Sequence, residues 1–150
     1  MGHTYSNNLY HIIFSTKDRV KILAARYREE THKYLCGVAR SLDCVVLDVN
    51  SVEDHVHLLA KIKPSVAVSD FTGKLKANSS RWFKKRFSPP TGFQWQSGFS
   101  SFTVSESSVE DVKVYIRGQE QHHRTVTFED ELKVFFRKHG VVFDPDHFFD

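Results

Sequence analysis

Residues 44–62 read CVVLDVNSVEDHVHLLAKI, and this stretch decides the fold of the chain around it. It contains two apolar runs, 44–50 and 55–62, which are rich in valine and leucine and are typical of strands. Only the short segment 51–54 separates them, and so short a connection predicts an antiparallel hairpin. The sheet of this protein is therefore expected to be antiparallel.

Strand and helix signals alternate along the rest of the chain. β-branched and aromatic residues predict further strands at 9–15 and within 93–105. Apolar residues at helical spacing predict helices over 25–42, 66–87, 108–122 and 127 to about 139. This order predicts one domain over residues 1–150, of the α+β class, with a ferredoxin-like (RRM-like) antiparallel sheet and helices on one face. Many functions share this fold, so the function must be inferred from the site.

The last two helices carry capping signals at their starts. Ser107 and Glu110 have the spacing of a capping box, in which the two side chains satisfy free backbone N–H groups. Thr127 and Asp130 repeat a weaker form of the signal. The tail that follows, VVFDPDHFFD (141–150), must bury its aromatic rings, either on this chain or on a partner subunit.

The composition is that of a soluble globular protein, with 40% hydrophobic and 26% charged residues in a chain of 150. No apolar run approaches the ~20 residues that cross a bilayer, and the start MGHTYSNNLY lacks the features of a signal peptide. Cys36 and Cys44 form no metal or redox motif and are expected to be reduced thiols. We therefore expect a cytoplasmic protein with no membrane partner.

The net charge of +3 is distributed unevenly along the chain. Residues 1–105 contain 15 basic and 8 acidic side chains, whereas residues 106–150 contain 6 and 10. The basic part is a candidate surface for a polyanion such as nucleic acid. A solvated basic face accounts for the same asymmetry, so charge alone does not decide between the two.

His55 and His57 are unusual residues for an apolar strand. Side chains two residues apart on a strand point to the same face, about 6.5–7 Å from each other. Two imidazoles at this separation can converge on one metal ion, but histidines are also common on half-exposed strands. The pair therefore needs a third ligand from elsewhere in the chain before it indicates a metal site.

Tyr115 and Gln119 are candidates to complete such a site. They are four residues apart in VYIRGQE, so on a helix they lie about 40° apart on one face. A helix beside the sheet would offer a phenol and an amide oxygen to the histidine face together. Alone, the same spacing fits an amphipathic rim residue and a solvated glutamine.

The combination of these motifs resembles the single-tyrosine transposases of the HUH superfamily, the IS200-like transposases of minimal insertion sequences. HUH denotes His–hydrophobic–His, which here is His55-Val56-His57. The segments YHIIFSTK (10–17), WQSGFSSFTVS (95–105) and QEQHH (119–123) also resemble segments of such transposases. The resemblance covers essentially the whole chain.

The resemblance implies a transposase that cleaves and rejoins single-stranded DNA at insertion-sequence ends, in a metal-dependent reaction without ATP. By position, Tyr115 is the nucleophile that forms a 5′-phosphotyrosine, and His55, His57 and Gln119 are the ligands of Mg²⁺ or Mn²⁺. His11 and Asp54 are candidates to orient the imidazoles. The DNA is expected to carry hairpins near the element ends.

A homodimer is expected because each chain has one nucleophile and an element has two ends. The resemblance implies the same assembly. Whether the Tyr115 helix serves the histidines of its own chain or those of the partner stays open at this stage.

DNA binding is expected at the basic end of the helix over 66–87, and on aromatic side chains that can stack on unpaired bases. His122 lies on the same helix face as Tyr115, where it would contact phosphate or cap the helix end. Part of the basic cluster also suits the helix dipole. The candidate DNA-binding residues are Lys74, Lys76, Arg81, Lys84, Lys85, Arg86, Trp95 and His122, with Trp82 and Phe93 as further stacking candidates.

Three other functions compete with this interpretation. A replication initiator or relaxase also nicks DNA through tyrosine, but this chain has no second clustered tyrosine and no helicase domain. A non-catalytic module that binds single-stranded nucleic acid would share the fold, but no RNP-type aromatic motif is present in the strands. A domesticated HUH nuclease that acts on host repeat DNA would keep every site residue, and it stays open.

Overall fold

The computed structural model describes residues 2–150 and contains a four-stranded antiparallel sheet. Its strands are β1 (Leu9–Ser15), β2 (Val45–Ser51), β3 (His55–Lys61) and β4 (Ser100–Val104), in the spatial order β2-β3-β1-β4. The predicted hairpin is β2–β3, and β3 also pairs with β1 so that Ile13 lies opposite His57. The α+β class and the antiparallel sheet are confirmed.

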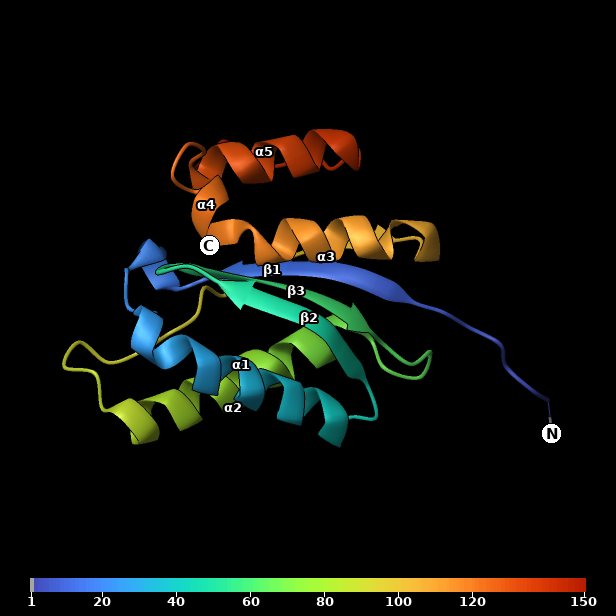
Figure 1. Ribbon diagram of the computed structural model, residues 1–150, viewed down its shortest axis with the longest axis horizontal. Coiled ribbons are helices and arrows are strands. Elements are labelled where there is room, and N and C mark those ends of the chain that lie inside the picture. Colours follow the sequence, from blue (N-terminus) through green and yellow to red (C-terminus); the bar gives the residue numbers. More distant parts are fainter. Residues whose placement is uncertain (1) are drawn as a thin grey trace.

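One face of the sheet is covered by two long helices, α1 (Ala25–Ser41) and α2 (Val68–Phe87), as Figure 1 shows. The strand residues that alternate with the histidines, such as Val56 and Leu58, point to this side and are fully buried. They form the main core together with Leu35 of α1 and Phe71 of α2.

Helices also cover the other face, which corrects the expectation that they would lie on one face only (Figure 1). These are α3 (Val109–Arg117), the short α4 (Gln119–His122) and α5 (Phe128–Lys138). The physical reason is that this face is apolar too. Leu9 and Leu59 pack against Ile116 of α3, and Ile13 packs against Leu132 of α5.

The predicted helix over 108–122 is divided into α3 and α4 at Gly118. The side-chain amide of Asn50 on β2 donates hydrogen bonds to the carbonyls of Ile116 and Arg117, at 2.9 and 3.2 Å. These bonds satisfy carbonyl groups that the end of α3 leaves free. The change of direction at Gly118 turns Gln119 into the protein, where its side chain is completely buried.

The capping signals have different outcomes. Thr127 is the N-cap of α5 and its hydroxyl accepts a hydrogen bond from the backbone N–H of Asp130, as predicted. The capping box at Ser107 is wrong, because α3 has Ser108 as its N-cap, with no side-chain cap bond. A 3-10 turn, Glu106–Ser108, precedes that helix, and two others span Lys17–Arg19 and Pro145–His147.

The aromatic tail packs on its own chain. Phe148 contacts Phe136 of α5, with their ring centroids 5.4 Å apart. The carbonyl oxygen of Asp150 accepts hydrogen bonds from the Gln96 side chain and the Gly98 N–H, both at 2.9 Å. The stretch 93–105 therefore completes the sheet as predicted through β4, while the residues before that strand are irregular and hold the tail.

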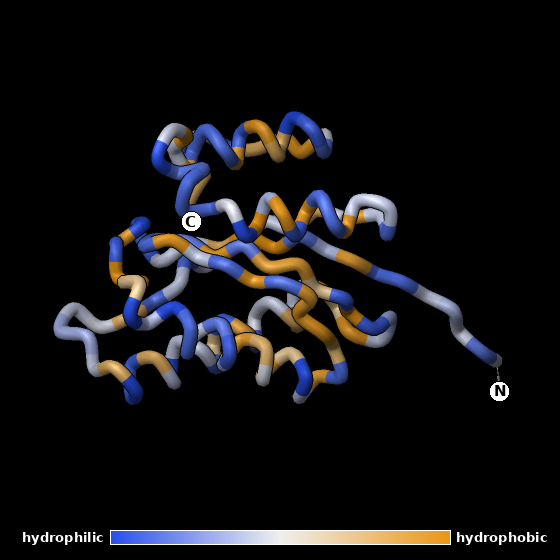
Figure 2. Tube along the Cα trace, viewed as in Figure 1, coloured by the Kyte–Doolittle hydropathy of each residue, from blue (hydrophilic) through white to orange (hydrophobic). Residues whose placement is uncertain are grey.

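Apolar residues lie along the strands and on the sheet-facing sides of the helices, and polar residues lie outside (Figure 2). Among residues 2–150, no helix has the length and apolar character needed to cross a membrane.

Candidate active site

His55 and His57 lie on the face of β3 that α3, α4 and α5 cover, and both are almost completely buried. Their ring centroids are 5.2 Å apart. The predicted shared face is therefore present. The two histidines are not half-exposed, as strand histidines commonly are, because the helices on this face cover them.

Each of these imidazoles is held by a neighbour through its Nδ1 atom. Asp54 Oδ1 lies 2.7 Å from His55 Nδ1, and His11 Nε2 lies 2.8 Å from His57 Nδ1. Asp54 and His11 thus occupy the orienting positions expected from the sequence. Such partners fix the direction in which the remaining nitrogen, Nε2, points.

The Nε2 atoms point toward Glu131 of α5, which the sequence analysis did not single out. Glu131 Oε1 lies 3.0 Å from His57 Nε2 and 3.5 Å from His55 Nε2. His123, in the turn after α4, brings a third Nε2 to 3.1 Å from the same oxygen. We name these four residues the histidine–glutamate cluster: their candidate ligand atoms all lie within 4.8 Å of one another.

The sequence did contain a signal for Glu131. It stands three residues after Phe128 and four before Phe135, so it belongs to the apolar stripe of α5 and faces inward. Because Glu131 follows two exposed acidic residues in FEDE, composition alone does not distinguish it from an exposed side chain. His123 belongs to the segment QEQHH, but its periodicity does not place it at the cluster, because its position depends on the turn that follows α4.

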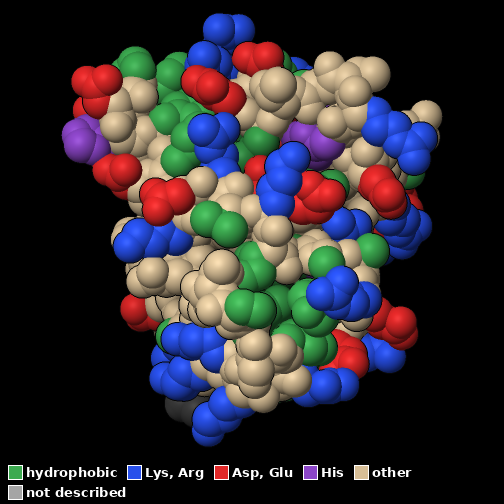
Figure 3. Space-filling model, turned by 90° about the vertical axis from the view of Figure 1, so that its left-hand side faces the viewer, with side chains coloured by type: hydrophobic (Ala, Val, Ile, Leu, Met, Phe, Trp, Pro, Cys, Tyr) green, Lys and Arg blue, Asp and Glu red, His purple; other side chains and the backbone are tan. Residues whose placement is uncertain are grey.

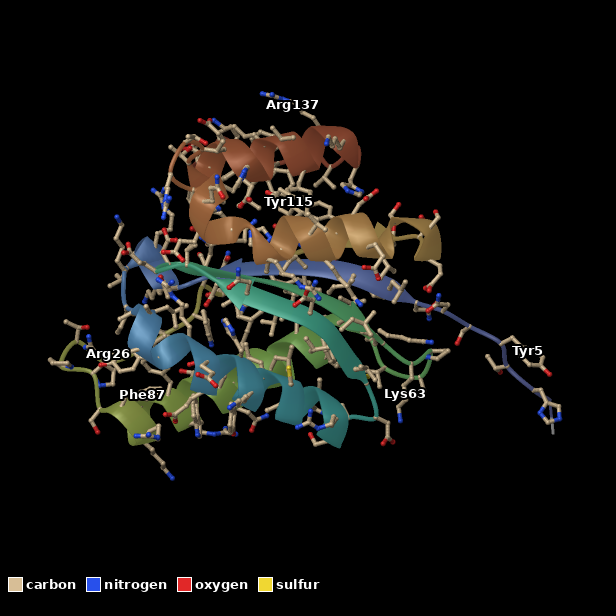
Figure 4. The ribbon with its side chains drawn as sticks, viewed as in Figure 1. Tyr5, Arg26, Lys63, Phe87, Tyr115 and Arg137 are labelled. Carbon is tan, nitrogen blue, oxygen red and sulfur yellow. The ribbon has the colours of Figure 1, made fainter. Side chains whose placement is uncertain are left out.

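Tyr115 reaches the cluster from α3, and Figure 4 places its side chain between α3 and α5. Its hydroxyl donates a hydrogen bond to Glu131 Oε2, the carboxylate oxygen that faces His122 at 3.2 Å rather than the three cluster histidines. His122 Nε2 lies 3.3 Å from the same hydroxyl. His122 is therefore beside Tyr115 across the break at Gly118.

Gln119 lies next to the cluster. Its amide nitrogen donates to Glu131 Oε2 at 3.2 Å, and its oxygen Oε1 lies 2.9 Å from His123 Nε2. The predicted meeting of Tyr115, Gln119, His55 and His57 is thus present in the structure.

The electrostatics of the site follow from burial and from the carboxylate. Burial, followed by the negative charge of Glu131, raises the pKa of Tyr115. Burial lowers the pKa of His57 to about 4, despite the opposing effect of Glu131. For Glu131, burial favours the neutral acid, but the adjacent imidazoles of His123, His55 and His57 together hold its pKa well below the usual range. The carboxylate is therefore ionised.

The donor set of this site fits a divalent cation. Imidazole nitrogens and an ionised carboxylate are good ligands for such ions, and here they converge on one region. Their outer atoms are held by Asp54, His11 and Tyr115, as is common for metal ligands.

Two pockets open beside the cluster. A pocket of about 490 Å³, here called the His55 pocket, is lined by His55 and His123. Its charged residues are the basic Arg19, Lys21, Arg28 and Arg124 and the acidic Glu53, Asp54 and Glu120. A second one of about 430 Å³, the Tyr115 pocket, is bordered by Tyr115 and by apolar residues such as Val134 and Phe135.

The basic residues predicted to bind DNA lie on α2, which covers the face of the sheet opposite the cluster (Figure 1). Arg86 forms a two-bond ion pair with Glu30, and Lys76 donates to the carbonyls of Ser97 and Gly98. Lys74, Arg81, Lys84 and Lys85 are exposed. The structure brings none of these α2 residues to Tyr115.

The stacking role predicted for Trp95 is wrong. Its side chain is only 6% exposed, its ring packs edge-on against Phe14, and its indole N–H donates to Ser79 Oγ at 2.9 Å. Phe93 is buried beside it. Neither ring offers a free face to a nucleobase.

A model of the family described as "Transposase IS200 like" matches residues 4–119 of this sequence. The chain belongs to this family. The matched range contains His55, His57, Tyr115 and Gln119 but ends before His123 and Glu131.

Individual relatives agree with the family. The transposase for insertion sequence element IS200 of Salmonella typhimurium is 31% identical over 87 residues, which are 58% of this chain and 57% of that protein. The chain thus spans little more than half the length of this curated relative. The ISDra2 transposase TnpA of Deinococcus radiodurans is 28% identical over 123 residues, covering 79% of this chain and 87% of the relative.

Solved structures share the fold. A crystal structure assigned to a transposase of Deinococcus radiodurans R1 matches with a TM-score of 0.64 and 27% identity, over 79% of this chain and 96% of that one. A REP-associated tyrosine transposase bound to a REP hairpin matches with a TM-score of 0.61 over 84% of this chain and 74% of that one. At 13% identity the second likeness concerns the fold alone.

Proposed function

We propose that this protein is a transposase that cleaves and rejoins single-stranded DNA through Tyr115, with the help of a divalent metal ion. One observation carries the proposal: the hydroxyl of Tyr115 and the Nε2 atom of His57 contact the two oxygens of one carboxylate, Glu131. A nucleophile and a candidate metal site are thus joined by a single buried side chain.

In the proposed reaction, the oxygen of Tyr115 attacks a phosphodiester and forms a bond to phosphorus. The bond from phosphorus to the 3′ oxygen breaks, and the proton lost by the tyrosine is balanced by the one gained at that oxygen. The products are a 5′-phosphotyrosine and a free 3′-hydroxyl, and a later attack by a 3′-hydroxyl reverses the step. Neither ATP nor water is consumed.

The site residues have different roles in the proposed reaction. His55 and His57 hold the cation, Mg²⁺ or Mn²⁺, with Gln119 as a further predicted ligand. When bound, such an ion supplies a Lewis acid that neutralises charge on the scissile phosphate. Glu131 holds the Tyr115 hydroxyl in place, and His122 lies within 3.3 Å of it. The raised pKa of Tyr115 keeps the phenol protonated in this resting arrangement.

We further propose that the scissile strand enters through the His55 pocket, where Arg124 and Arg28 lie close to the cluster. The Tyr115 pocket, which is mainly apolar, would receive a sugar or base next to the cleaved bond. Figure 3 shows one end of the molecule, where Lys and Arg side chains are interspersed with acidic side chains over the surface. We propose that flanking DNA extends from the His55 pocket to the exposed lysines of α2.

The proposed working unit is a homodimer, because two element ends must be cut and each chain has one nucleophile. In the described chain, Tyr115 meets the histidines of its own chain. We propose that Tyr115 serves the histidines of its own chain in that dimer.

A test uses single-stranded oligonucleotides from the flanks of the gene, labelled at the 3′ end, with Mg²⁺ or Mn²⁺. The label must be at the 3′ end because a 5′-phosphotyrosine retains the downstream fragment. A labelled band at the mass of the protein on a denaturing gel, absent with a chelator, would support the proposal. A retarded native complex without any adduct would contradict it and favour a binding module or a domesticated nuclease with a different target.

A further inference from the structure

The hydrogen bonds of two imidazoles determine which of their nitrogens carries the proton. His55 Nδ1 lies 2.7 Å from a carboxylate oxygen of Asp54, and His123 Nδ1 lies 2.8 Å from the carbonyl of Val126. Both partners are acceptors, so each Nδ1 is the donor. A neutral imidazole protonated at Nδ1 exposes a lone pair at Nε2.

These two Nε2 atoms lie only 3.0 Å apart. Two lone pairs at this separation repel each other unless a cation lies between them. Two more acceptors face the same point: Gln119 Oε1 at 2.9 Å and Glu131 Oε1 at 3.1 Å from His123 Nε2. His57 joins them when its Nδ1 donates to His11, because its own Nε2 is then free toward Glu131.

The cation between these atoms is either a proton or a metal ion. A proton would satisfy one pair of atoms and leave the other acceptors facing one another in a buried space. A metal ion would satisfy all of them at once. The four ligand atoms of the histidine–glutamate cluster, all within 4.8 Å of one another, have the compactness that a single ion requires.

We propose that His123 and Glu131 are metal ligands, so that the centre has three imidazoles and one carboxylate. This inference rests on the proposed function for the role of His55 and His57, and it adds two ligands that lie beyond the range matched by the family model. The side-chain amide of Gln119 donates to Glu131 Oε2 and thereby positions the carboxylate, while its oxygen faces the same centre.

Such a centre favours transition ions over Mg²⁺. Imidazole ligands suit zinc and the later transition ions, whereas Mg²⁺ prefers an octahedral shell of oxygens and keeps several waters. We therefore expect the chain to bind Mn²⁺ at least tenfold more tightly than Mg²⁺, and Zn²⁺ more tightly still, in the order that such sites generally follow.

The test is metal binding by the full chain, stripped with a chelator and free of DNA. Calorimetric titration with MnCl₂ should give one site per chain. Glu131→Gln and His123→Gln should each weaken it at least tenfold, whereas Glu129→Gln, an exposed position on the same helix, should leave it unchanged. Variants with unchanged Mn²⁺ affinity would overturn the proposal, as would wild-type protein that binds no Mn²⁺, since the cation in the centre would then be a proton.

A measurement on the wild-type protein avoids any loss of folding in the variants. X-ray absorption of the Zn²⁺-loaded chain should show three imidazole nitrogens, and two would overturn the proposal. The DNA adduct assay separates this inference from the proposed function. Adduct formation with only two imidazoles on the metal would support the proposed function and overturn the proposal of new ligands. Three imidazoles on the metal without any DNA adduct would support the proposed metal ligands and contradict the proposed function.

Discussion

Tyr115 donates a hydrogen bond from its hydroxyl to Oε2 of Glu131, while the other oxygen of that carboxylate lies 3.0 Å from His57 Nε2. The nucleophile of the proposed reaction and its metal site are thus connected by one side chain of α5. A change that moves the carboxylate of Glu131 must therefore affect both the nucleophile and the metal site.

Replacing Tyr115 with Phe removes the nucleophilic oxygen and one hydrogen bond. The covalent DNA adduct should fall to background, while the affinity for single-stranded DNA should stay within a few-fold of wild type. Denaturing gels and a binding titration measure the two quantities. Tyr5→Phe is the matched control, since Tyr5 is 93% exposed and far from the cluster (Figure 4). Full activity of Tyr115→Phe would remove this residue as the nucleophile.

Replacing His57 with Ala removes an imidazole that points at the centre of the cluster. Metal-dependent cleavage should be lost, and partial rescue by excess Mn²⁺ would mean that ligation is weakened rather than absent. The rate of adduct formation against Mn²⁺ concentration measures this. His147→Ala, at an exposed position, provides the control. A variant with the metal dependence of wild type would argue against His57 as a ligand.

A mixture of the Tyr115→Phe and His57→Ala variants tests which chain supplies the tyrosine. Because Tyr115 meets the cluster of its own chain, no complete site can form in the mixture. We expect it to be as inactive as either variant alone, after subunits have been exchanged by dilution and reconcentration. Recovered adduct formation would show that the α3 helix acts on the partner subunit's histidines.

Charge reversal can separate the two DNA-binding surfaces. Arg124→Glu, in the His55 pocket, should weaken binding of a short oligonucleotide and reduce the slope of log affinity against log salt by about one. Lys84→Glu with Lys85→Glu, on α2, should weaken only longer DNA that carries flanking sequence, and should flatten its salt dependence. Equal effects of both changes on the short oligonucleotide would contradict the path proposed for the scissile strand.

Stability should depend on pH through His32, which lies outside the cluster. Burial lowers the pKa of His32 from 6.5 to about 4. Between these values the unfolded chain binds more protons at His32, so the unfolding free energy falls as the pH falls, by up to about 1.4 kcal/mol per pH unit. His32→Gln can still bond to Ser51 and should reduce this slope in urea unfolding at pH 4.5–6.5 with a chelator present. His3→Gln, at an exposed position, is the control. If His32→Gln has the same pH slope as wild type, the proposed contribution of His32 to stability is refuted.

The sequence by itself determined the local features of this protein. The period-two pattern of β3 placed His55 and His57 on one face of the sheet. The hydroxyl of Thr127 marked the start of α5. Each of these features depends on residues only a few positions apart, whose relative geometry is set by the strand or helix itself.

Only the tertiary structure decided which residues complete the site. Glu131 lies 74 positions after His57, and their contact depends on the break at Gly118 and the return of α5 over the sheet. Local periodicity does not encode the path of a turn. For the same reason the strand and helix patterns do not reveal that helices cover both faces of the sheet, or that the ring of Trp95 is buried. Burial on each face is decided by which distant apolar side chains meet there, and this is settled only when the whole chain packs.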